Sequence, residues 1–340
     1  MLKSVRVQGY KCLRDVSVEL GPMNVLVGRN DSGKSSFLQA LAEPSRALLR
    51  WLPTDVREVS NGEWTIDMEG TKGTLHFAAT EWNKPRFRAP AGQVESLNFL
   101  SRRLAEIWFL KHDEHTSTDP VSLDPLQVAV RSPAAAGALD AFVSSRGAGT
   151  AAHLASLALG DRSRFDAIEA AVQAATEGRV RTLVVKDIGG STYTLAFKLV
   201  DGTVVSAAQM SEGVLLFVGF QALLQREPLP GLLLVEEPER GLHPERLREV
   251  MGALRALSER GTQVLLTTHS PDVVSVCRAS EVRVFHRSRP DSATSVHRLP
   301  EDLDPGASGG PLGQIWSTRG VEGLIDLVRE PPLLVAHTEG

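Results

Sequence analysis

The chain has 340 residues, of which 42% are hydrophobic and 23% are charged, and its formal net charge is −4. These proportions are ordinary for a globular protein and exclude a disordered or fibrous chain, while the length suits two domains or one large α/β unit. The slightly acidic balance argues against a strongly basic nucleic-acid binder, and two cysteines are too few for a disulfide framework or a cysteine-based zinc site.

The same composition predicts a cytoplasmic protein without a membrane partner. No apolar run approaches the roughly 18 residues that a membrane-spanning helix needs. The opening residues, MLKSVRVQGYK, lack the apolar stretch of a signal peptide. The scarcity of cysteine suits a reducing compartment.

Periodicity predicts a strand-rich N-terminal part. Strands are expected at residues 2–9, 16–20 and 23–27, and apolar spacing predicts a helix from Lys34 to about Leu49. The elements expected further on are strands at 63–69 and 74–79, a polar connection at 81–92, a helix from 96 and a strand at 107–110.

In the second half of the chain, helices and strands alternate. A helical stretch is predicted at 151–175 and a β-meander at 180–206. The elements that follow are an apolar helix at 214–224, strands at 232–235, 263–267 and 281–286, a helix at 244–260, a Gly/Pro loop at 304–313 and a short helix at 320–328. Because the buried strands are short apolar runs separated by helices, we expect an α/β fold whose mostly parallel sheet is covered on both faces.

Residues 28–35, GRNDSGKS, fit the phosphate-loop pattern G-x-x-x-x-G-K-[ST] without a mismatch. The loop follows an apolar strand and opens a helix, so that backbone N–H groups and the positive end of the helix dipole meet at one point. We therefore predict ATP binding, with Lys34 reaching the β- and γ-phosphates and Ser35 ligating Mg²⁺. The other nucleotide-binding candidates in this loop are Gly28, Asn30, Ser32, Gly33 and Ser36.

A second motif is acidic. The apolar run LLLV at 232–235 is followed by EEPE, which places carboxylates at the end of a buried strand, where ligands of open α/β sheets bind. We assign Glu236 to Mg²⁺ and Glu237 to the attacking water, as the catalytic base. Asp is commoner than Glu at the metal position, so Glu236 is a departure. The alternative is a charged turn after a core strand.

Two further motifs are weak indicators of function when each is taken alone. In MSEG, at residues 210–213, Ser211 is expected to cap the apolar helix and, with Gly213, to form an anion site. In TTHS, at 267–270, the imidazole of His269 follows a strand and is placed to contact a γ-phosphate.

The order of the four motifs resembles the head of an ABC-type ATPase of the RecF/SMC/OLD-like branch. The stretches that carry the resemblance are VRVQGYKCLRDVSVEL, VLVGRNDSGKSS, LLLVEEPERGLHP and VLLTTHSPDVV, and they cover about residues 1–50 and 205–290. It implies a P-loop NTPase of ABC-ATPase-head type, with a mostly parallel core sheet, an N-terminal antiparallel β subdomain and a helical lobe. The chain also resembles freestanding bacterial AAA family ATPases that lack a Toprim nuclease domain.

Such heads bind ATP between two protomers, which implies an ATP-dependent homodimer. By matching position, Ser211 would touch the γ-phosphate of the partner, His269 would be the switch histidine, and residues 240–243 would lie at the dimer seam. A glutamine of the metal shell is also expected, and Gln93 and Gln127 both remain candidates for it.

The resemblance also suggests a layout and a role. The expected parts are a nucleotide-binding lobe at 1–95, a helical lobe and β-meander at 96–225, the rest of the nucleotide-binding lobe at 226–290 and an extension at 291–340. That extension is too short for a Toprim nuclease, so none is expected. The expected role is a Mg²⁺-dependent ATPase that switches DNA or a separately encoded effector, in DNA maintenance or phage defence. The alternatives are the ATP-binding subunit of a membrane transporter and a nucleotide switch with little turnover.

Three groups of residues carry less weight. The sequence HDEH at 112–115 reads as a solvated loop rather than a metal cluster. Lys84, Arg86 and Arg88 read as a solvated linker rather than a nucleic-acid footprint. Lys11 and Arg14 are weaker candidates to flank the nucleotide.

Overall fold

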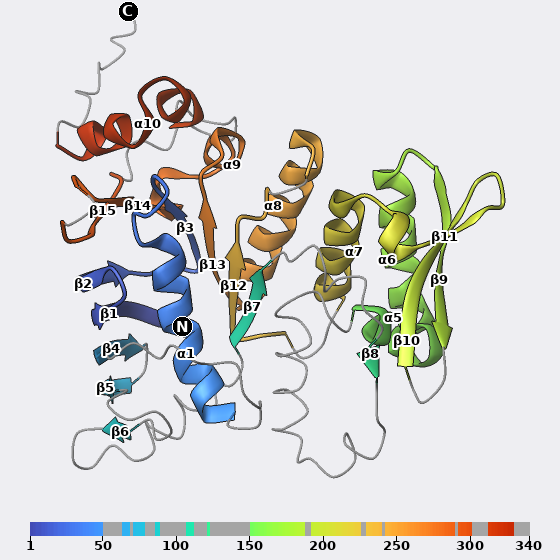
Figure 1. The fold of residues 1–340 in the computed structure, drawn as a ribbon, viewed down its shortest axis with the longest axis horizontal. Coiled ribbons are helices and arrows are strands. Elements are labelled where there is room, and N and C mark those ends of the chain that lie inside the picture. Colours follow the sequence, from blue (N-terminus) through green and yellow to red (C-terminus); the bar gives the residue numbers. More distant parts are fainter. Residues whose placement is uncertain are drawn as a thin grey trace, which may run out of the picture.

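The computed structural model is described here for residues 1–49, 63–68, 71–78, 86–88, 107–111, 121–122, 150–187, 192–225, 229–239, 242–289, 292–300 and 312–329. Figure 1 shows two sheets and a helix, α1, at one end of the molecule, and a lobe of helices and strands at the other end.

The central sheet contains six of the described strands, in the order β15-β14-β3-β13-β12-β7. Their bounds are β3 Met23–Val27, β7 Ile107–Lys111, β12 Leu232–Glu236, β13 Gln263–Thr268, β14 Val282–His286 and β15 Ser295–Arg298. All neighbours pair in parallel except β14 and β15. The predicted, mostly parallel sheet is therefore confirmed.

Both faces of this sheet are covered by apolar side chains, which explains why its inner strands β3, β12 and β13 contain short apolar runs. In β12, Leu232 and Leu234 pack into one hydrophobic cluster, while Leu233 and Val235 pack into another on the opposite face. The first cluster includes Phe37 of α1, which spans Lys34–Leu49, and the second includes residues of α7, Glu212–Leu224, and α8, Pro244–Glu259.

An antiparallel sheet lies over α1, in the order β2-β1-β4-β5-β6. Its strands are β1 Leu2–Tyr10, β2 Leu13–Glu19, β4 Glu63–Met68, β5 Thr71–Ala78 and β6 Arg86–Arg88. The prediction of a polar connection at 81–92 misses β6, which pairs antiparallel with β5 so that Phe87 lies opposite Phe77 in the register. Three residues are too short to show the two-residue period of a strand.

The lobe at the other end contains the predicted β-meander. Its described elements are β8 Val121–Ser122, α5 Thr150–Gly160, α6 Arg162–Ala175, β9 Val180–Asp187, β10 Thr192–Leu199 and β11 Val204–Ser206. The helix expected at 151–175 is two helices, because Asp161 interrupts it. The Asp161 side chain accepts a hydrogen bond from the backbone N–H of Arg164 and so caps α6.

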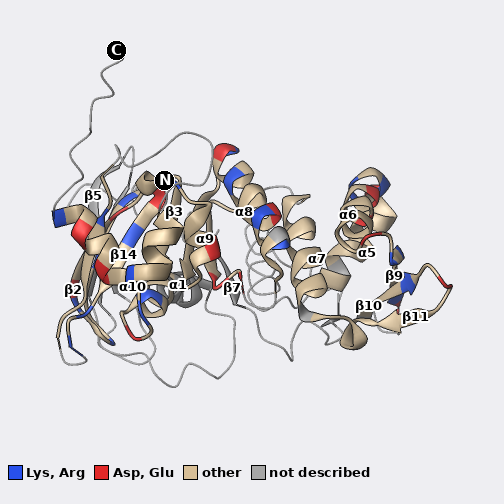
Figure 2. Cartoon of the chain, turned by 90° about the horizontal axis from the view of Figure 1, so that it is seen from above, with Lys and Arg blue, Asp and Glu red and all other residues tan. Residues whose placement is uncertain are grey.

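Helix α7 lies between α6 and α8 and joins the lobe to the central sheet. Figure 2 shows charged residues along both neighbours, whereas α7 has no charged residue after Glu212. A helix that is apolar all round is a buried helix, and α7 packs accordingly. Its direction is therefore fixed by the core.

The C-terminal region differs most from the sequence prediction. Helix α10 spans Leu312–Arg329, so it begins inside the loop expected at 304–313 and is longer than the short helix expected at 320–328. Gly320 interrupts its helical geometry at φ 59°, a left-handed conformation that favours glycine. Helix α10 packs against the short helix α9, Pro271–Ser275, and against β14 and β15. The polar strand β15 was not predicted either.

One buried glutamine links the two sheets. The side chain of Gln263, at the start of β13, is 1% exposed and bonds to both backbone groups of Leu2 on β1, at 2.8 Å each, and to the carbonyl of Gly21 at 2.9 Å. The amide thus satisfies polar groups that lie in an apolar environment.

We expect Gln263→Leu to lower the free energy of unfolding by about 2–4 kcal/mol, because it keeps the volume but leaves buried backbone groups of Leu2 without partners. Urea denaturation would measure the change. Gln209→Leu is the matched control: Gln209 is exposed and bonds only within its own turn, so its effect should stay within about 0.5 kcal/mol. Equal effects of the two variants would contradict the role of Gln263.

Candidate nucleotide site

The three strongest motifs meet at one edge of the central sheet. Val27, the last residue of β3, pairs with Thr268 of β13, and Glu236, the last residue of β12, pairs with Thr267. Because the three strands are parallel, their carboxyl ends lie together. The phosphate loop, the EEPE segment and the TTHS turn therefore start side by side.

Two positions of the phosphate loop require glycine. A Cβ atom on Gly28 would lie 2.3 Å from the carbonyl oxygen of Phe285 and 2.7 Å from Oγ of Ser32. Gly33 has φ +101°, and a Cβ atom there would lie 2.8 Å from Cδ2 of Leu13. The loop thus packs more closely on its neighbours than a larger residue allows.

Contacts from the region of β14 and β15 hold the loop through its carbonyl groups. The Thr294 hydroxyl donates to the carbonyl of Ser32 at 3.0 Å, and Nη1 of Arg287 donates to the carbonyl of Asp31 at 3.0 Å. Asp31 itself has φ 63°, an uncommon conformation for a residue with a side chain. The loop geometry is therefore fixed by the surrounding fold.

Lys34 is buried, with 6% of its surface exposed. Its ammonium donates to the carbonyls of Gly28 at 2.8 Å and Arg29 at 2.9 Å. Burial lowers the pKa of Lys34 from its usual value, and nearby carboxylates partly oppose that shift. Those carboxylates belong to Glu237, Glu239, Asp31 and Glu236. A buried cation with this environment suits a ligand that brings its own negative charge.

The serines of the loop differ in their surroundings. Oγ of Ser32 is buried and has no hydrogen-bond partner. Oγ of Ser36 accepts a hydrogen bond from the Cys12 thiol at 3.4 Å, and Ser35 is partly buried in the first turn of α1. Asn30 is exposed. The first turn of a helix has N–H groups without helical partners, and it is the natural place for a phosphate.

The acidic segment turns sharply as it leaves β12. Glu237 has φ 48°, and its backbone N–H lies 3.1 Å from the carbonyl oxygen and 3.3 Å from Oγ1 of Thr267. Such a conformation costs about 1 kcal/mol or more and persists where the surrounding structure enforces it. Thr267 is fully buried and provides that anchor.

His269 lies between two carboxylates. Its Nδ1 is 3.1 Å from Oε1 of Glu237 and 3.7 Å from Oε1 of Glu239. The same Glu239 oxygen accepts hydrogen bonds from the Thr268 hydroxyl at 2.6 Å and from the His269 backbone N–H at 3.2 Å. The structure thus brings together Glu237 and His269, which the sequence predicted separately from two motifs.

Glu239 is a site residue that the sequence analysis did not assign. Its side chain is 9% exposed, and its Oε2 is buried without a hydrogen-bond partner. In the sequence, Glu239 is the last residue of EEPE and has the same residue type as Glu236 and Glu237, to which roles were assigned. Its partners Thr268 and His269 come from a strand about thirty residues away, so their contact could not be foreseen.

Ser211 occupies the N-cap position of α7, as expected, but its side chain makes no capping hydrogen bond. The side chain of Ser211 is exposed, so its hydroxyl lies at the surface of the molecule. Helices α1 and α7 pack on opposite faces of the central sheet. The structure therefore does not join Ser211 and Gly213 to the phosphate loop of the same chain.

Several weaker candidates give no further site. Gln93, Gln127, Lys84 and residues 112–115 and 240–241 lie outside the described residues, and for Arg86 and Arg88 only the backbone is described. His243 is the N-cap of α8 without a side-chain capping bond. The Lys11 ammonium donates to the side chain of Gln39 on α1.

Within the described ranges, no cluster of three or more His, Cys, Asp or Glu side chains could hold a metal ion unaided. Mg²⁺ in phosphoryl-transfer sites takes only one or two protein oxygens and is otherwise held by phosphates and water. The Ser35 hydroxyl and the Glu236 carboxylate are oxygen donors of that kind, so the residues present fit the ion. The described helices include none that is long and apolar enough to cross a membrane.

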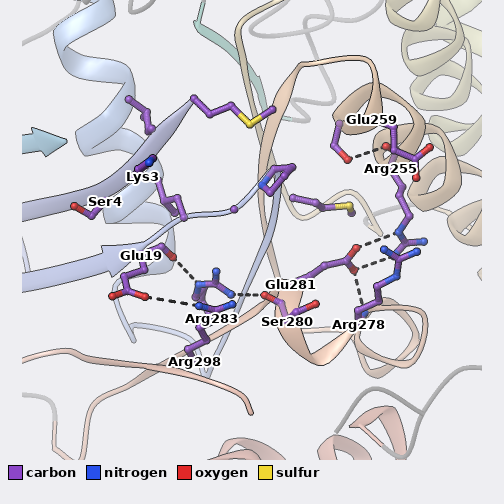
Figure 3. Close-up of a pocket in the computed structure, with 17 residues that line it drawn as sticks. Lys3, Ser4, Glu19, Arg255, Glu259, Arg278, Ser280, Glu281, Arg283 and Arg298 are labelled. Atoms are coloured by element: carbon purple, nitrogen blue, oxygen red, sulfur yellow. Dashed lines mark hydrogen bonds and ion pairs between the residues drawn. The ribbon is translucent and has the colours of Figure 1, made fainter. Parts of the chain in front are cut away.

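A cavity of about 970 Å³ lies at the other edge of the central sheet, near the first residue of β3 (Figure 3). Several of its charged residues pair with each other or with the backbone. The Arg255 guanidinium donates a bidentate pair of hydrogen bonds to the Glu281 carboxylate, at 2.9 and 3.1 Å. Arg283 donates to the carbonyl of Glu19 at 2.7 Å. This cavity is separate from the phosphate loop.

A phosphate loop on a helix between an antiparallel and a mostly parallel sheet defines a P-loop ATPase head. The fold is similar to an SMC head bound to the C-winged helix domain of ScpA, with a TM-score of 0.61 and 13% identity over 89% of this chain and 99% of that one. It is also similar to an SMC head with an extended coiled coil bound to the C-terminal domain of ScpA derived from Pyrococcus furiosus, with a TM-score of 0.54 and 12% identity over 88% and 96% of the two chains. The predicted fold class is confirmed.

Residues 95–275, more than half of the chain, match the family model described as "AAA domain, putative AbiEii toxin, Type IV TA system", and the chain belongs to this family. Residues 1–49 match a model described as "AAA ATPase domain". A segment of 41 residues, 12% of this chain, is 42% identical to an OLD nuclease of Thermus scotoductus and spans only 8% of that protein. These matches confirm the SMC/RecF/OLD-like resemblance.

We expect Lys34→Ala to weaken binding of Mg²⁺–ATP by about a hundred-fold or more, because no other group supplies a buried positive charge at this loop position. Isothermal titration calorimetry would measure it. Lys186→Ala, which removes an exposed lysine on β9, is the control and should bind as wild type does. A folded Lys34→Ala protein with wild-type affinity would contradict the assignment of the loop.

Proposed function

We propose that the chain is a Mg²⁺-dependent ATPase head that closes into a dimer around ATP and thereby switches a partner. The observation that carries the proposal is the meeting of the buried Lys34 ammonium, the Glu237 carboxylate and the His269 imidazole at one edge of the sheet. A cation for the phosphates, a base and a polar group beside the base are the parts that ATP hydrolysis needs.

Nucleotide binding rests on the phosphate loop. Lys34 would exchange its bonds to loop carbonyls for bonds to phosphate oxygens, while Gly28, Gly33, Ser32 and Ser36 keep the loop close to the ligand. Ser35 and Glu236 would hold Mg²⁺, which supplies neutralising charge on the phosphates. Glu236 in place of the commoner Asp reaches further from its strand.

Hydrolysis rests on Glu237. Its side chain is 31% exposed, so water reaches it, and His269 lies within hydrogen-bond distance on one side. A hydrogen bond between the imidazole and Glu237 would direct the carboxylate, and a carboxylate can accept a proton from the attacking water. His269 would also contact the γ-phosphate from its strand end.

Dimerisation rests on the position of Ser211. Its hydroxyl and the first N–H groups of α7 lie at the positive end of the helix dipole, where binding of a phosphate is favoured. Because α7 and α1 lie on opposite faces of one sheet, the nucleotide that Ser211 contacts would belong to a second copy of the chain.

The partner is proposed more broadly, as DNA or a separately encoded effector. Support comes from the relatives: SMC heads are bound to ScpA domains in solved structures, and the short OLD match is to a nuclease. A transporter subunit is disfavoured because MSEG and EEPERGLHP replace the L-S-G-G-Q and D-E-P-x-x-x-L-D patterns. ATP turnover with and without DNA, and identification of proteins that co-purify with the chain, would test the partner.

Glu237→Gln should leave ATP affinity within about two-fold of wild type and abolish turnover, because glutamine has nearly the same shape but does not accept the proton. Phosphate release would measure turnover, and light scattering should show a persistent dimer with ATP. Glu259→Gln, on the far end of α8, is the control. If hydrolysis survives in Glu237→Gln and is lost in Glu236→Gln, the two carboxylate roles are reversed.

Ser211→Arg should block ATP-driven dimerisation while the monomer binds ATP within a few-fold of wild type, since the phosphate loop is untouched. Mixing Ser211→Arg with Lys34→Ala protein should restore partial ATPase activity, because one complete shared site can form. Neither variant should be active singly. If the Ser211→Arg monomer fails to bind ATP, Ser211 serves the site of its own chain and the shared arrangement is wrong.

A further inference from the structure

Helix α10 lies directly beside the turn that carries His269. The turn leads into α9, and Gly313 of α10 packs on α9 so closely that a Cβ atom there would lie 2.5 Å from Cβ of Ser275 and 3.0 Å from the carbonyl oxygen of Pro271. Leu312, Gly313 and Leu324 are buried. The first turns of α10 are thus seated against the segment that follows the motif TTHS.

From this position, Trp316 reaches the histidine itself. Its indole Nε1–H donates a hydrogen bond to the backbone carbonyl of His269 at 3.2 Å. An indole has one donor and no acceptor, so this bond uses its whole polar capacity. The rest of the ring packs against the larger hydrophobic cluster, which restricts the side chain.

Hydrogen bonds therefore fix the peptide groups on both sides of His269. Oε1 of Glu239 accepts its backbone N–H at 3.2 Å, and Trp316 donates to its carbonyl. The imidazole is 54% exposed, so packing contributes little to its orientation. The 3.1 Å distance between Nδ1 and Glu237 therefore depends on where the backbone of residue 269 is placed.

We propose that Trp316 is a positioning residue for His269, which makes the C-terminal helix α10 part of the ATPase site. This inference rests on the proposed function for its catalytic consequence, but the positioning itself is a property of the chain without nucleotide. Movement of α10 relative to α9 changes the placement of the imidazole beside Glu237 and thereby the rate of hydrolysis.

Trp316→Phe tests the positioning, because it keeps an aromatic ring against the hydrophobic cluster and removes the N–H donor with the part of the indole that carries it. Ser317→Ala is the matched control: it removes a hydrogen bond from the next residue of α10, to the carbonyl of Gly313, that does not reach the turn. Both variants should unfold within a few degrees of the wild type, because each loses a single hydrogen bond.

The first measurement is nuclear magnetic resonance of ¹⁵N-labelled histidine rings in the nucleotide-free protein, with His269 identified by the signals lost in His269→Gln. In Trp316→Phe, the ring signals of His269 should shift and its Nδ1–H should exchange faster with water, while Ser317→Ala leaves both unchanged. Unchanged His269 signals in Trp316→Phe would overturn the proposal, whether or not the chain hydrolyses ATP.

The second measurement is steady-state ATPase activity. Trp316→Phe should lower kcat about ten-fold with KM for ATP within two-fold, because Lys34 and its loop are unaffected. In a His269→Gln background, Trp316→Phe should cause no further loss, since it acts through that histidine. Full additivity of the two losses would overturn the proposal. Shifted ring signals in a wild-type protein without turnover would uphold the positioning and reject the proposed function.

Discussion

The parallel pairing of β12, β13 and β3 is the constraint on which the candidate site depends. It places Glu236 opposite Thr267 and Thr268 opposite Val27, so that three loops from distant parts of the chain begin at one edge. A one-residue shift in the pairing register of a strand would turn each of its side chains to the opposite face of the sheet. Because hydrophobic clusters lie on both faces, the apolar pattern distinguishes the two faces weakly, and polar contacts at the strand ends add to the specification of the register.

Gln263 and Thr267 provide those contacts at the two ends of β13. The buried amide of Gln263 is bonded to Leu2 and Gly21 at the amino end, and buried Thr267 receives the N–H of Glu237 at the carboxyl end. Loss of the Gln263 amide leaves buried backbone groups of Leu2 unsatisfied, which is a larger penalty than loss of an apolar contact of similar size. The register of the sheet and the placement of the proposed catalytic base are thus set by one strand.

The sequence predicted the parts of the site that lie within single motifs. The phosphate loop, the carboxylates after β12 and the histidine after β13 are each recognisable from neighbours along the chain. What it could not predict are contacts between motifs. Glu239 bonds to the turn of His269 some thirty residues away, and Trp316 lies 47 residues from its acceptor. Strand β6 and the start of α10 were missed for a related reason, because short or irregular segments show no period and are defined by what they pack against.

The two halves of the proposed site lie on opposite faces of the same sheet, and this separation has a structural consequence. The phosphate loop opens α1 on one face, while Ser211 opens α7 on the other, and the buried length of α7 prevents its end from turning toward α1. Under the proposed function, a single chain would present two unlike surfaces, each incomplete for one nucleotide. A two-fold symmetric dimer would place each surface opposite the other kind twice, so that one symmetric interface would complete both sites. In the proposed dimer, the nucleotide would form the contact between protomers, and its hydrolysis at Glu237 would remove that contact.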